Sequence, residues 1–159
     1  MSGLFLGKTG QSLPISGWNV SNVTDMSGMF RNSDMNEDIS GWNVSNVTNM
    51  SGMFQGNTTL SDTKASYLNE WNVSNVTNMS FMFKETNLAS VNLNNWNTGS
   101  VTNMDRMFAG VTNFNGDITS WNTASVTNMD RMFKHCEKFN KDITNWNTAN
   151  VTTMKGMFY

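Results

Sequence analysis

The stretch WNVSNVTNMSGMF at residues 42–54 occurs, with small changes, six times along the 159-residue chain. Each copy begins with Trp and carries Met-Phe eleven and twelve residues later, and successive Trp residues lie 24, 29, 25, 25 and 25 residues apart. A pattern kept residue by residue at such a period is typical of repeat proteins, in which each unit buries its apolar column against the next. We therefore predict a solenoid. Its structural core is predicted to centre on Trp18, Trp42, Trp71, Trp96, Trp121 and Trp146.

The apolar spacing changes within each unit. The Trp and the Val or Thr two residues later share one face of a predicted short strand, and one such strand per coil gives a narrow parallel β-sheet. The following Val-Thr-x-Met-x-x-Met-Phe places Met, Met and Phe on one face of a short helical or 3-10 turn on the opposite side. The Thr of this segment is interpreted as the N-cap of that turn.

The whole chain, residues 1–159, is predicted to be a single solenoid domain. Residues 1–14, with Leu4, Phe5, Leu6 and Leu13, are expected to close one end, and residues 15–158 hold the six repeats. Residues 55–67 are longer than the equivalent segments of other copies, and we expect a polar loop that could contact a partner. No polar closing repeat follows the sixth copy, so an open C-terminal edge is expected.

Composition excludes several classes of function. Only 14% of residues are charged and the net charge is -2, so we expect no nucleic-acid partner. The single Cys (Cys136) and single His (His135) exclude an intrachain disulfide and a Cys/His zinc cluster. No pair of nucleophile and base has catalytic spacing, and we expect neither an enzyme nor a cofactor nor a metal site. No signal peptide or membrane-spanning run is visible in this chain.

The repeats resemble those of the BspA-like leucine-rich repeat surface proteins, whose units of about 25 residues follow the pattern W-N-V-S-N-V-T-N-M-S-x-M-F. Residues 42–54 and 71–83 are closest to that pattern, and the resemblance covers residues 15–158. The resemblance implies a leucine-rich-repeat-like parallel solenoid on a cell or particle surface, with adhesion or recognition as its role. It supplies no catalytic residues.

The candidate ligand-facing strip is formed by the residue that follows each Trp, which is Asn in every copy. Its members are Asn19, Asn43, Asn72, Asn97, Asn122 and Asn147. One interpretation is a structural ladder in which the side-chain amides bond from coil to coil. The other is a flat, uncharged surface for glycan hydroxyls or protein backbone. The two interpretations are compatible, and only the second predicts a ligand.

Other polar columns have simpler interpretations. Asp38, Asp117 and Asp142 are expected to cap turns rather than to bind calcium. Most of the 14 Met residues are expected to fill the core rather than to bind a soft metal. Arg106 and Arg131 lie beside acidic residues and are interpreted as a solvated convex face that could orient a partner.

The leading hypothesis is a non-catalytic recognition or adhesion module that binds a protein or glycan on another surface. It would use the Asn strip and the loop at residues 55–67. The alternative is a structural spacer or assembly unit that self-associates end to end through open solenoid ends. A minor alternative is ice binding by the regular row of Thr residues.

Overall fold

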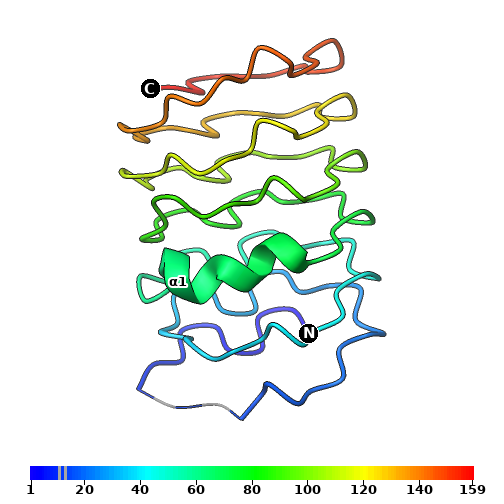
Figure 1. The fold of residues 1–159 in the computed structure, drawn as a ribbon, viewed down its shortest axis with the longest axis vertical. Helices are drawn as coiled ribbons and strands as arrows, with labels where there is room; N and C mark the ends of the chain where they lie inside the picture. Colours follow the sequence, from blue (N-terminus) through cyan, green and yellow to red (C-terminus); the bar gives the residue numbers. More distant parts are fainter. Residues whose placement is uncertain (11, 13) are drawn as a thin grey trace.

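The chain forms a stack of coils that rises along the long axis of the molecule, from the blue end to the red end of Figure 1. The computed structural model describes residues 1–10, 12 and 14–159. Within them, the helices are α1, Asp62–Ala65, and a 3-10 helix η1, Ser66–Glu70. Leu13, expected to help close one end, lies outside the described residues.

The predicted parallel β-sheet is wrong. The described residues contain no strand, only isolated parallel bridges between single residues of neighbouring coils. These bridges join the residues just before the first Met of each unit, not the Trp segments. They run through Asp25, Asn49, Asn78, Asn103, Asn128 and Thr153. The fold class expected from the sequence, a leucine-rich-repeat-like solenoid built on a parallel sheet, is therefore overturned.

The segment with the two Met residues is a ribbon of consecutive turns rather than a helical turn. The N–H of Gly28 bonds to the carbonyl of Ser51 in the next coil at 2.8 Å, and Phe30 bonds to Met53 at 2.9 Å. The intervening N–H of Met29 bonds within its own turn, to Met26 at 3.2 Å. Backbone bonds thus alternate between coils and turns, so neither a continuous ladder nor a helix forms.

A left-handed residue makes this ribbon possible. Gly28 and Gly52 occupy the third position of their turns with φ of 58° and 59°. Glycine adopts this conformation without a steric cost, whereas a helical turn requires negative φ throughout. The N-cap role predicted for the Thr column is consequently wrong. The hydroxyl of Thr48 instead donates to the carbonyl of Thr24 in the preceding coil, at 3.2 Å.

The Trp segments lack sheet bonding because local turns use their backbone groups. The N–H of Trp42 bonds to Ile39 at 3.1 Å, and the N–H of Ser45 bonds to the side chain of Asn43 at 3.1 Å. Asn side chains compete in this way with secondary structure for backbone N–H groups. Buried and exposed residues do alternate in these segments, but the backbone that carries them forms turns instead of a strand.

The core consists of stacked columns of identical residue types. Phe54 and Phe83 are fully buried, and their rings stack with centroids 5.8 Å apart and planes 1° apart. Burial of a side chain of this size contributes about 1.5–3 kcal/mol. Five of the six Trp residues are no more than 8% exposed. Trp18 in the first repeat is 40% exposed and packs against Phe5.

Residues 1–7 form a further partial coil at the N-terminal end. The N–H groups of Gly3 and Phe5 bond to the carbonyls of Ser27 and Met29, as one coil bonds to the next elsewhere. The ring of Phe5 stacks on Phe30 at 5.6 Å. Leu4 and Leu6 are about half exposed, at 47% and 53%, whereas Met1 and Phe5 are partly buried and pack against the core.

The segment at residues 55–67 is not a simple polar loop. It includes α1 and leads into η1, which run across the outside of the coils (Figure 1). Leu60, Ala65 and Leu68 are at most 1% exposed and belong to the core. The apolar residues of the insertion therefore anchor it to the stack, together with the fully buried Asn57, whose Nδ2 donates to the carbonyl of Met35 at 3.0 Å.

Candidate functional site

The Asn strip lies on the surface, and all six of its residues are exposed. In each copy the side-chain Oδ1 accepts the backbone N–H two residues later, at distances from 3.0 to 3.2 Å. The coil-to-coil ladder expected of these Asn residues is therefore wrong, because their bonds are local turns. A local bond of this kind fixes the plane of the amide without using its Nδ2 donors.

The coil-to-coil side-chain ladder is formed three residues further on. Nδ2 of Asn46 donates to the carbonyl of Ser21 at 2.7 Å, and Nδ2 of Asn75 donates to Ser45 at 2.7 Å. The hydroxyl of Ser100 continues the ladder to Ser74 at 2.7 Å. The sequence contained a signal for this column, because every copy has Asn or Ser four residues after its Trp.

The Thr row is exposed, but from Thr48 onward its hydroxyl protons are already used. The hydroxyl of Thr102 donates to the carbonyl of Thr77 at 3.1 Å, and Thr127 donates to Thr102 at 3.1 Å. Similar bonds join Thr48 to Thr24, Thr77 to Thr48, and Thr152 to Thr127. The row therefore stabilises the stack, and it offers ice or another ligand oxygen acceptors rather than free donors.

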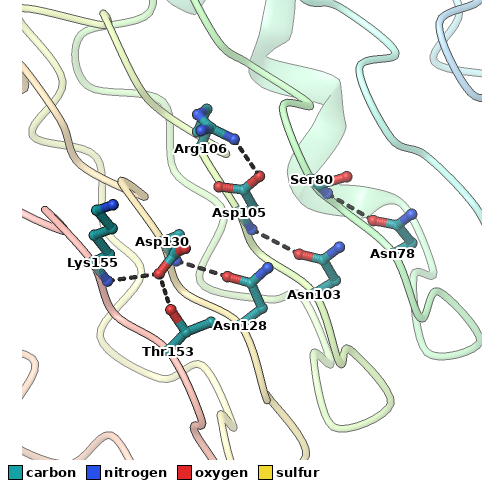
Figure 2. A network of polar contacts seen from close by, with 9 residues as sticks. All are labelled: Asn78, Ser80, Asn103, Asp105, Arg106, Asn128, Asp130, Thr153 and Lys155. Carbon is teal, nitrogen blue, oxygen red and sulfur yellow. Dashed lines mark hydrogen bonds and ion pairs between the residues drawn. The ribbon is translucent and has the colours of Figure 1, made fainter.

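The turn ribbon carries a second polar network (Figure 2). Oδ1 of Asn103 accepts the N–H of Asp105 at 2.9 Å, and Asp105 pairs with Arg106 at 2.6 Å. Burial raises the pKa of Asp105. One coil further, Asp130 accepts bonds from the Thr153 hydroxyl and the backbone N–H of Lys155, and the hydroxyl bond lowers the pKa of Asp130.

The three Asp residues considered for calcium form turns instead. Oδ1 of Asp117 accepts the N–H and the hydroxyl of Thr119, at 3.1 and 2.8 Å. Asp142 bonds to Thr144 in the same way, and Asp38 accepts the N–H of Ser40. The predicted capping role is confirmed. Within the described residues, no group of three or more His, Cys, Asp or Glu side chains is placed to hold a metal ion.

His135 and Cys136 do not form a catalytic pair. The Cys136 thiol donates to the carbonyl of Phe108 at 3.0 Å, and burial raises its pKa to about 12. The exposed His135 ring lies 6.1 Å from the ring of Tyr159. A protonated thiol of this kind is a poor nucleophile.

One protein-family model, described as "Mycoplasma protein of unknown function, DUF285", matches the chain over residues 1–68 and 59–159. No curated protein and no solved structure was found to be significantly similar. In the part of the chain that the structure describes, no helix has the length and apolar character needed to span a membrane.

Proposed function

We propose that this chain, which belongs to the DUF285 family, is a non-catalytic recognition module that binds a protein or glycan through the Asn strip. The family description assigns no activity. The proposal rests instead on the geometry of the strip and on the repeat pattern.

The observation that carries the proposal is that all six Asn side chains make the same local hydrogen bond. Each Oδ1 is held by its own turn, so each amide has the same orientation relative to its coil. The Nδ2 groups form no hydrogen bond to another described residue. The strip therefore offers a row of oriented donors, one per coil, to ligand oxygen atoms.

The chemistry of the strip favours neutral ligands rich in oxygen acceptors. Sugar hydroxyls and peptide carbonyls have that character, whereas the strip contains neither the charges nor the aromatic rings that anchor tight complexes. Each contact is expected to be weak, and affinity would increase when several copies of the chain engage one surface.

The resemblance of the repeats to BspA-like surface proteins supports the same proposal. It supports a location on a cell or particle surface, where the module would contact a partner on another surface. A display of many copies there would supply the multivalency that a weak strip requires.

A glycan array and intact cells, probed with the labelled chain, test this function. The informative variant is Asn72→Asp/Asn97→Asp, because Asp retains the oxygen that accepts the turn bond and loses the Nδ2 donors. The control is Asn113→Asp/Asn140→Asp, which changes two exposed Asn residues outside the strip by the same chemistry. Saturable binding lost only in the first variant supports the proposal. Binding that is unchanged in it, or absent from the native chain, contradicts it.

A second proposal is assembly through the terminal coils, which expose large apolar side chains. Phe158 and Tyr159 are 63% and 78% exposed in the last coil, and Leu4 and Leu6 are exposed in the first. Sedimentation of the native chain and of a Phe158→Asp/Tyr159→Asp variant tests this role. A native oligomer that dissociates in the variant supports assembly, whereas a native monomer at high concentration contradicts it.

A further inference from the structure

A hollow of about 440 Å³ opens on the turn face across three consecutive coils. Ala109 and Gly110 line its middle, where the equivalent residues of the coils on either side include Lys84 and Lys134. A short pair of side chains between two long pairs leaves a gap in the column. The hollow is thus a consequence of two variable positions in an otherwise regular repeat.

The charge of this hollow differs from that of the chain. Its lining includes the cations Lys84, Arg106, Arg131 and Lys134, and Glu85 is the carboxylate residue among the lining residues. The whole chain has a net charge of -2. Four cations from three coils therefore converge on one site in a protein that is acidic overall.

Neighbouring groups orient most of these cations. The Arg106 guanidinium pairs with Asp105 at 2.6 Å and lies 5.3 Å from the centre of the Phe81 ring. The Lys134 ammonium lies 4.9 Å from the centre of the Tyr159 ring. Side chains held in this way lose less conformational entropy when they bind a ligand.

Arg131 interacts with the charges of Asp105 and Asp130 but forms an ion pair with neither. No carboxylate among the described residues lies within ion-pair distance of its guanidinium, whereas Lys84 pairs with Glu85 at 2.8 Å. A guanidinium fork matches two oxygen atoms of a carboxylate, phosphate or sulfate. Arg131 is therefore the natural first contact for such a group.

The turns do not require arginine at these positions. Arg106 and Arg131 have φ of 53° and 51°, and the equivalent residues of other coils include Gly28 and Gly52, with nearly the same φ. A non-glycine residue is disfavoured in this conformation by roughly 1 kcal/mol. The side chains are thus present at a cost to the fold, as is Phe81 with φ of 61° at the equivalent position, and the cost points to a role for these side chains.

We propose that this hollow binds an oxyanion group, a phosphate, sulfate or carboxylate, through Arg131 and Arg106 with Lys134. The site is separate from the Asn strip and does not depend on its function. Asp105 and Asp130 border the same face and would repel a long polyanion, so the hollow suits a single anionic group.

Amide chemical shifts in a ¹⁵N-labelled chain test this proposal directly. Sodium sulfate, phosphate and acetate are titrated separately, with sodium chloride at equal ionic strength as the reference. We expect saturable shifts at Ala109 and Gly110 with at least one oxyanion and not with chloride. The anion that saturates at the lowest concentration distinguishes a phosphate, a sulfate and a carboxylate source.

The variant Arg106→Gly/Arg131→Gly removes both guanidinium groups and restores the glycine that other coils carry. Its apparent affinity for the oxyanion should fall at least about tenfold, because charged hydrogen bonds are lost. The control Lys138→Ala/Lys141→Ala removes two charges elsewhere and should retain binding. A Lys134→Gln variant is a second test, because it removes a cation and leaves the turn residues unchanged. We expect it to bind the oxyanion more weakly than the native chain does. Shifts that never saturate, equal affinity in the Gly variant, or an equal loss in the control would each overturn the proposal.

Discussion

The indole nitrogen of Trp42 donates a hydrogen bond to the carbonyl oxygen of Ile15, 3.0 Å away in the preceding coil. Trp121 makes the same bond to Leu93 at 3.0 Å. The indole N–H of Trp71 is also buried but has no partner among the described residues. The Trp column therefore stabilises the stack by packing in every buried copy and by hydrogen bonding in only some.

This difference predicts unequal costs for the same substitution. Trp121→Phe removes ring volume and a hydrogen bond, whereas Trp71→Phe removes ring volume and an unpaired donor. We expect Trp121→Phe to lower the free energy of unfolding by about 1 kcal/mol more than Trp71→Phe. Urea denaturation of both variants measures the difference, and equal losses would contradict the role given to the indole bond.

The Thr ladder predicts a stability effect at an exposed position. Thr102→Val keeps the shape of the side chain and loses the hydroxyl that donates to Thr77, so the free energy of unfolding should fall by about 0.5–1.5 kcal/mol. Thr112→Val is the control, because Thr112 is exposed and lies outside the ladder. Thermal or urea unfolding would contradict the ladder if both variants behaved alike.

The partly buried thiol of Cys136 predicts low reactivity. Because the pKa of Cys136 is raised to about 12, the thiolate fraction at pH 8 is far below that of a free cysteine. Reaction with a disulfide reagent should be at least about a hundredfold slower in the folded chain than in the chain unfolded in urea. Similar rates in the two states would show that the thiol is not protected.

Acid should destabilise the fold through its Asp turns. Hydrogen bonds from Thr119 and Thr144 hold the pKa values of Asp117 and Asp142 below the ordinary 3.8. Their contribution is therefore complete above that value and is lost as the pH falls through the lowered folded-state pKa. Urea unfolding between pH 2 and 6 should show a smaller acid loss in Asp117→Asn/Asp142→Asn. An unchanged pH profile would contradict this assignment.

The pKa of Asp105 is shifted in the opposite direction to those of Asp117 and Asp142. Burial raises it, so protonation at falling pH favours the folded state at this residue and partly offsets the loss from the other Asp residues. The acid sensitivity of the native chain is therefore the difference between two opposing groups of carboxylates.

The sequence predicted the stacking columns but not their backbone. Trp, Met and Phe at fixed offsets indicated which side chains share the core, because burial depends on the spacing of apolar residues. The strand and the helical turn failed for a local reason. Asn43 captures a backbone N–H that a strand would need, and Gly28 adopts a left-handed conformation that a helix excludes. Gly in the Met-Ser-Gly-Met-Phe segment was the available signal.

The oxyanion hollow required a comparison across copies. Ala109 and Gly110 are unremarkable alone, and they define a gap only beside Lys84 and Lys134 in neighbouring coils. The N-terminal coil was missed for a similar reason, since Met1 to Phe5 repeats the Met26 to Phe30 segment with one substitution. The Asn strip was found because its residue type is constant, but its local bonding depends on backbone turns that the sequence analysis did not predict.

Native-state hydrogen exchange tests most directly whether turn ribbons, and not a sheet at the Trp segments, join the coils. The amides of Phe108 and Gly110 bond to the next coil at 3.0 and 2.8 Å. Those of Asn97 and Thr98 bond to no carbonyl of the described residues. The account predicts slow exchange for Phe108 and Gly110 and markedly faster exchange for Asn97 and Thr98. Equal protection of the two pairs would show that the Trp segments form the sheet and would contradict the account.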